Sequence, residues 1–85
     1  MELAWNVLKN ERLKKTRGAS FDDLIDSRLI AVKRHPTKDH QNLMLFYYRG
    51  YIWVVPFVRD GEKIFLKTLF PSRKYTRLHK KGELK

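Results

Sequence analysis

Three runs of apolar, β-branched and aromatic residues, separated by short turns, make up the longest hydrophobic pattern in the chain. Such residues suit a pleated, half-buried surface. Asp60-Gly61 is a strong hairpin signal, because a type I′ turn requires positive φ at both central residues. Arg49-Gly50 is a weaker signal, since only Gly50 adopts that geometry without cost. The pattern predicts an antiparallel meander with strands near residues 43–48, 51–58 and 63–70.

The middle run is apolar on both faces of the predicted strand, with Tyr51, Trp53, Val55 and Phe57 on one face and Ile52, Val54 and Val58 on the other. Such a strand is either covered on both faces, or covered on one and used for contact on the other. Pro56 interrupts the run because proline has no N–H to donate to a neighbouring strand. A bulge at Pro56, or pairing that ends at Val55, would each accommodate it.

The N-terminal third of the chain predicts two helices. Asn6 can cap a helix over residues 6–17, and Gly18 suits the left-handed position after its last turn. Ser20 can cap a second, short helix, in which Asp23 occupies the position of a capping box. These acids therefore have a structural explanation that does not require catalysis.

A fourth apolar run, residues 29–32, predicts the first strand of the sheet. The polar loop that follows it, residues 35–42, is long for a hairpin, and loops of that length often carry function. Near the C-terminus, Ser72 is expected to cap a basic helix over residues 73–81.

These elements predict an α+β fold in one domain, residues 1–85, with two N-terminal helices, a four-stranded antiparallel sheet and a short C-terminal helix. The chain has no cysteine, which excludes disulfides and zinc–thiolate sites. No uncharged apolar run has the length of a membrane span, and no signal peptide is apparent. We therefore expect a cytoplasmic protein that makes no membrane contact.

The chain is strongly basic, with 19 Lys and Arg against 9 Asp and Glu and a formal net charge of +10. Such a charge favours polyanions, whether nucleic acid, anionic membrane or an acidic protein. Arg and Lys residues interleaved with aromatic residues suit RNA, because bases stack on the rings while the cations hold phosphates, although aromatic residues on strands are more often part of the core. RNA also carries its own nucleophile, the 2′-OH, so cleavage requires only positioning, proton transfer and cations at the reacting phosphate.

Motifs that would name another chemistry are absent from the sequence. There is no Gly-rich phosphate loop and no spacing of His residues or acids typical of a metal site. We therefore expect neither a cofactor nor a metal. The three histidines, His35, His40 and His79, occupy predicted loop or terminal positions.

Two motifs resemble the BrnT family, toxins of the wider RelE-like group in bacterial type II toxin–antitoxin systems. That family opens with Trp-Asp, a Lys four residues after the Trp, Lys-His-Gly and Val-Ser-Phe-Glu-Glu. The corresponding residues here are Trp5-Asn6, Lys9, Thr16-Arg17-Gly18 and Ala19-Ser20-Phe21-Asp22-Asp23. The family's C-terminal Ser-Ala-Arg-Lys-Ala-Thr-Arg-Arg-Glu is matched here at Arg73, Lys74, Thr76 and Arg77.

The resemblance implies RNA cleavage that stops translation, and neutralisation by a cognate antitoxin, often a ribbon-helix-helix DNA-binding protein that forms an oligomer with the toxin. On this interpretation Arg17, Arg73 and Arg77 bind phosphate and stabilise the transition state. His40 or His79 transfers a proton. The remaining basic candidates position the RNA, namely Lys9, Lys15, Arg49, Lys67 and Lys74.

Two other interpretations of the sequence remain open. A non-catalytic RNA- or DNA-binding module would bind RNA without producing new RNA ends. A regulatory subunit that only docks a partner through its basic face would leave growth unaffected when expressed alone.

Overall fold

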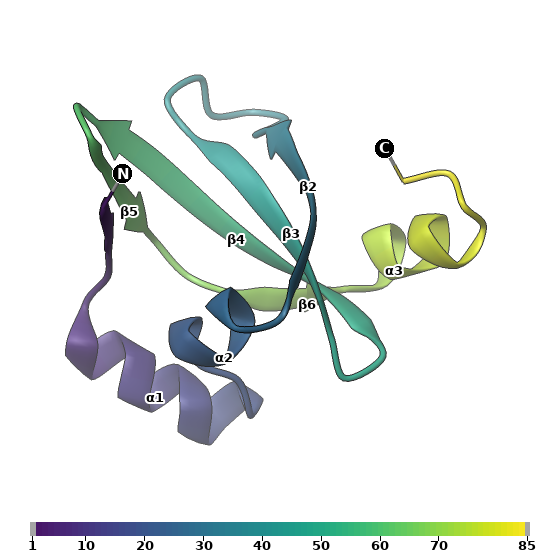
Figure 1. The fold of residues 1–85 in the computed structure, drawn as a ribbon, viewed down its shortest axis with the longest axis horizontal. Helices are drawn as coiled ribbons and strands as arrows, with labels where there is room; N and C mark the ends of the chain where they lie inside the picture. The colour runs from purple at the N-terminus through teal and green to yellow at the C-terminus, as the bar shows by residue number, and fades with distance from the viewer. Residues whose placement is uncertain (1, 85) are drawn as a thin grey trace.

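The computed structural model describes residues 2–84, which form one sheet with helices on both of its faces (Figure 1). Along the chain the elements are β1 (Glu2–Ala4), α1 (Val7–Arg17), α2 (Phe21–Ile25), β2 (Arg28–Arg34), β3 (Asn42–Tyr48), β4 (Tyr51–Asp60), β5 (Lys63–Leu66), β6 (Phe70–Ser72) and α3 (Arg73–Lys80). The sheet has the strand order β1-β5-β4-β3-β2, and β6 pairs with β4 beyond the end of β5. The β1–β5 pair is parallel and the other pairs are antiparallel.

The predicted architecture of two N-terminal helices and a four-stranded antiparallel meander is therefore wrong. The sheet is six-stranded and mixed, a strand precedes the helices, and α1 is the one N-terminal helix of full length, since α2 has only 5 residues. β1 has only 3 residues, too short for a periodic pattern, and it exists because β5 offers a free edge. The predicted short C-terminal helix is confirmed as α3.

The third predicted strand is divided into β5 and β6 at the point where Pro56 lies opposite it. β4 pairs with β5 from Phe57 onward and with β6 up to Val54. Between these two ladders, Val55 and Pro56 face three residues, 67–69, so the interruption is a bulge. Pro56 keeps its register opposite Leu43 of β3, and its carbonyl accepts a hydrogen bond from the Lys67 N–H. The position at which Pro56 has no N–H to donate therefore lies at the interruption of the ladder.

Both faces of β4 are buried, which is the first of the two arrangements that its pattern left open. One face packs under α1 and α2 in a cluster that includes Leu13, Phe21, Trp53 and Phe57. The opposite face contributes Ile52 and Val54 to a smaller cluster, which Tyr75 of α3 and Leu84 cover. β4 is therefore the central strand of two separate cores.

Thr76 of α3 completes the hydrogen bonding at the start of β4. Its hydroxyl accepts from the Ile52 N–H at 2.8 Å and donates to the Ser72 carbonyl at 2.5 Å, and the residue is only 6% exposed. β6 ends at Ser72, which lies opposite Ile52, so the side chain of Thr76 replaces the backbone acceptor that β6 no longer supplies. This contact fixes α3 against the edge of the sheet.

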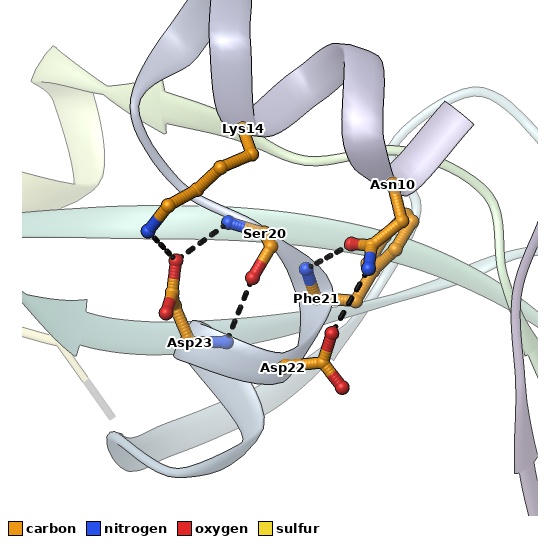
Figure 2. Close-up of polar contacts among 6 residues, drawn as sticks. All are labelled: Asn10, Lys14, Ser20, Phe21, Asp22 and Asp23. Atoms are coloured by element: carbon orange, nitrogen blue, oxygen red, sulfur yellow. Dashed lines mark hydrogen bonds and ion pairs between the residues drawn. The ribbon is translucent and has the colours of Figure 1, made fainter. Parts of the chain in front are cut away.

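A polar junction joins α1 to α2 (Figure 2). The Asn10 side chain accepts from the Phe21 N–H at 2.7 Å and donates to Asp22 at 2.9 Å. Ser20 and Asp23 form a capping box at the start of α2, and Lys14 pairs with Asp23 at 2.6 Å. These contacts hold α1 and α2 at a fixed angle. Gly18, which has the left-handed conformation with φ 78°, caps the C-terminal end of α1.

We expect Thr76→Val to destabilise the protein, because the buried Ile52 N–H then has no partner. A buried donor left without a hydrogen bond costs about 1–3 kcal/mol, and each kcal/mol lowers Tm by about 4–8 °C in a domain of this size. Thermal unfolding by circular dichroism measures the change. Thr68→Val is the matched control, since no hydrogen bond of the Thr68 hydroxyl is found among residues 2–84. Equal melting temperatures for the two variants would refute the role of Thr76.

A second prediction concerns Asp23 and pH. The hydrogen bond from Lys14 is the main cause that lowers the pKa of Asp23 below its ordinary 3.8; burial opposes it and Ser20 adds to it. A carboxyl whose pKa is lower in the folded state stabilises the fold above the unfolded pKa, and this contribution disappears as the pH falls through the folded value. Asp23→Asn should therefore lower Tm by about 2–4 °C at neutral pH.

The same difference in Tm should shrink as the pH falls below about 3.8. Asp26→Asn is the control, because the exposed Asp26 carboxylate makes no hydrogen bond with any residue in the described part of the chain. A difference in Tm between the parent protein and Asp23→Asn that stays constant down to strongly acidic pH would show that the ion pair does not contribute.

Candidate nucleic-acid interface

The polar face of α3 forms one wall of an open hollow. Arg73, Thr76, Arg77 and Lys80 are spaced three and four residues apart, so they lie on one face of the helix. Thr76 is buried against β4, which turns the longer basic side chains on either side of it toward solvent. The hollow has a volume of about 540 Å³ and is lined by Tyr51, Arg73, Thr76, Arg77, Lys80 and Lys81.

A second hollow shares Tyr51 with the first. It has a volume of about 330 Å³ and is lined by Arg17, Tyr51, Trp53, Pro71 and Arg73. Tyr51 and Arg73 line both hollows, so the two are adjacent. The end of α1, the start of β4 and the start of α3 therefore meet around one exposed tyrosine. None of the residues that line these two hollows is acidic.

A hydrogen bond to the backbone holds the Arg17 side chain at the second hollow. Its Nη1 donates a hydrogen bond to the Leu69 carbonyl at 2.5 Å, across 52 residues of sequence. Leu69 belongs to the segment between β5 and β6, where the ladder with β4 is interrupted and a carbonyl is free to accept. A guanidinium has five N–H donors, so Arg17 keeps donors for a ligand while one is used by the protein.

No acidic side chain among residues 2–84 forms an ion pair with any of the three arginines. Among residues 2–84 the one ion pair is Lys14–Asp23, which lies in the α1–α2 junction. A guanidinium stays charged at any working pH and can bind a phosphate through two parallel hydrogen bonds. The hollows that Arg17, Arg73 and Arg77 line are therefore suited to a phosphodiester backbone, with room for a nucleotide between the cations.

The structure brings together the three arginines predicted to act on phosphate, but not the two histidines. His40 lies in the exposed β2–β3 loop, at the opposite end of β3 from the turn that leads to Tyr51 (Figure 1). His79 lies on another face of α3, with its ring 5.2 Å from the ring of Tyr47, and it lines neither hollow.

The predicted RNA-positioning residues are spread over the surface. Lys9 and Lys15 are on α1, and Lys15 lines a third hollow beside the α1–α2 junction, which also contains acids. Arg49, Lys67 and Lys74 each place a cation over an aromatic ring of their own neighbourhood, at 5.1, 5.7 and 5.6 Å from the ring centre. None of these five residues lines the two hollows around Tyr51.

Sequence reasoning missed Tyr51 as part of the site. The alternating pattern of β4 placed it on the same face as Trp53, which is buried, and left open whether that face is covered or makes contacts, so Tyr51 was not among the predicted site residues. Tyr51 is instead 50% exposed, because α1 and α2 do not extend over the first residue of the strand. Its position next to the Arg49-Gly50 turn is the one sequence feature that indicates exposure, since strand ends beside turns are less covered.

No protein-family model matches this chain, and no curated protein matches it in sequence. The crystal structure of the ribonuclease toxin BrnT from Brucella abortus is similar in fold, with a TM-score of 0.56 over 85% of this chain and 96% of that one, at 18% sequence identity. The comparison confirms, at the level of the fold, the resemblance to BrnT that the two sequence motifs indicated. An identity this low establishes the fold alone.

Two further observations concern metal binding and membrane crossing. Within residues 2–84, no three His, Asp or Glu side chains are grouped so that they can hold a metal ion. In the same part of the chain, no helix has both the length and the apolar content that a membrane crossing requires.

Proposed function

We propose that this protein is the toxin of a type II toxin–antitoxin system, a cytoplasmic endoribonuclease that blocks translation. The observation that carries the proposal is the convergence of Arg17, Arg73 and Arg77 on two adjacent hollows without acidic residues. The shared fold with a ribonuclease toxin supports it independently. RNA would lie across the hollows, with its phosphates on the arginines.

Cleavage on this proposal proceeds through attack of the 2′-OH on the adjacent phosphorus, which forms a 2′,3′-cyclic phosphate and breaks the bond to the 5′-oxygen of the next nucleotide. The 2′-OH proton passes to water, and water protonates the departing 5′-oxygen. Negative charge develops on the phosphoryl oxygens, and preorganised cations stabilise it without reorganising at the moment of reaction. Arg73 lines both hollows and is best placed for this role, with Arg17 and Arg77 on either side. His40 and His79 stand outside the hollows, so charge stabilisation carries most of the acceleration.

An antitoxin that covers the hollows would inactivate the protein in two ways. It would exclude RNA by occupying the site, and acidic side chains of the antitoxin would compensate the arginine charges. A protein with a net charge of +10 gains from such a partner, because complementary charge accelerates association.

A non-catalytic RNA-binding module is the second candidate. The position of both histidines outside the hollows favours it, because general acid–base catalysis requires a group within hydrogen-bond reach of the proton that moves. Binding of RNA without the appearance of new ends would identify this candidate.

Purified protein is expected to cleave RNA in excess EDTA, and Arg73→Ala and Arg77→Ala are expected to lose that activity. Loss of a cation at the developing charge typically costs about 10²–10³-fold in rate. Single-turnover cleavage of one RNA measures the effect, with melting curves that should stay within a few degrees of the parent protein. Arg34→Ala is the matched control, since Arg34 is an exposed arginine at the His40 end of the sheet.

Retention of more than about a third of the parent rate by both Arg73→Ala and Arg77→Ala is far less loss than removal of a transition-state contact should give. That result would remove α3 from the reacting centre. A requirement for one specific metal, tested by re-addition after EDTA, would contradict the proposed chemistry.

Expression of the parent gene alone is expected to arrest growth and to shorten cellular transcripts, whereas Arg73→Ala at the same protein level should allow growth. The reason is that a toxin acts only when its site is uncovered and chemically competent. Growth curves and RNA blots after induction provide the measurement. Normal growth with intact transcripts at confirmed levels of parent protein would rule out the toxin proposal.

A further inference from the structure

Tyr51 differs from the other tyrosines in the contacts of its ring. Tyr47 and Tyr48 each contact another aromatic ring, and Tyr75 packs into the smaller core beneath α3. Within residues 2–84, the Tyr51 side chain has no aromatic ring pair, no cation over its ring and no hydrogen bond of its hydroxyl. Half of its surface is exposed, although it begins the most deeply buried strand of the sheet.

The backbone of Tyr51 is held on both sides. It lies opposite Tyr48 across a two-residue turn in which Arg49 and Gly50 have positive φ, 52° and 82°. The next residue, Ile52, donates its N–H to the buried hydroxyl of Thr76. A ring on such a backbone loses little conformational freedom when a ligand covers it, because only two side-chain torsions remain to be ordered.

Both hollows that share this ring contain cations. Arg17 lines one hollow, Arg77 and Lys80 line the other, and Arg73 lines both. In a single strand of nucleic acid every base is flanked along the backbone by two phosphates. An exposed ring shared by two hollows that both contain cations therefore matches one unpaired nucleotide, with its base on the ring and a neighbouring phosphate in each hollow.

From this geometry we infer that Tyr51 is a stacking platform for one unpaired nucleobase, which orients the strand so that the phosphates on either side of that base meet the arginines. The inference rests on the proposed binding of RNA and narrows its substrate to single strands or loops. A duplex keeps its bases stacked on one another, so it can contact the arginines through phosphates alone and cannot use the ring.

Binding of an oligodeoxynucleotide of about 10 residues with one central 2-aminopurine tests this inference, because a site of this kind spans roughly 4–16 nucleotides. The absence of a 2′-OH prevents cleavage. The parent protein should quench the 2-aminopurine fluorescence on binding, as stacking requires. Tyr51→Ala should lose the quenching and about 5- to 100-fold in affinity for the single strand, whereas Tyr51→Phe should keep both.

Two controls separate stacking from charge and from folding. Tyr47→Ala removes another partly exposed tyrosine, on the adjacent strand and outside both hollows, and should change single-strand affinity by less than about two-fold. The same oligonucleotide annealed to its complement should bind the parent protein and Tyr51→Ala equally, because phosphate contacts alone hold it. Melting curves check that each variant is folded.

Equal losses of single-strand and duplex affinity in Tyr51→Ala, no loss in either, or a parent protein that binds without quenching would each overturn the inference. The assay does not depend on catalysis. If single-strand binding depends on Tyr51 but no RNA is cleaved in the separate assay, the ribonuclease proposal fails and the stacking platform stands. If RNA is cleaved but Tyr51→Ala binds normally, the stacking platform fails and the ribonuclease proposal stands.

Discussion

The structure depends on the requirement that β4 be paired along both edges and buried on both faces. One edge of β4 pairs with β3 from Tyr51 to Phe57, and the other edge pairs with two different strands, β5 and β6. Pro56 marks the change from one to the other, because it offers no N–H at the position where the ladder is interrupted. The hydrogen bonds that satisfy the backbone groups at this interruption position the helices around it.

Two side chains complete the hydrogen bonding around that interrupted edge, and both lie at the candidate site. Arg17 donates to the Leu69 carbonyl within the interruption, which brings the end of α1 to the sheet. Thr76 supplies the acceptor for Ile52 where β6 ends, which fixes α3 beside the start of β4. The same hydrogen bonds that satisfy buried backbone groups therefore gather cations from both ends of the chain around Tyr51.

The distribution of charge is consistent with a surface that has to bind a polyanion. The α1–α2 junction contains the one ion pair found among residues 2–84, and it serves to hold two helices together. The hollows around Tyr51 contain only cations, aromatic rings, Pro71 and a buried threonine. Arginines that line adjacent hollows and have no ion pair among residues 2–84 repel one another, so their arrangement costs stability, which a bound phosphate backbone would restore.

Local sequence determined the elements of this protein whose stabilising contacts are near in the chain: the caps of α1 and α3, the turns at Gly50 and Gly61, and the two apolar faces of β4. The arginines that line the two hollows were also indicated by type, through charge and a family resemblance. Tertiary structure alone decided the parallel pairing of β1, the division of the last predicted strand, the exposure of Tyr51 and the separation of both histidines from the arginines. The physical reason is that each of these depends on which strand edge or helix end is free after the rest has packed, and neither pattern nor propensity along the chain specifies that.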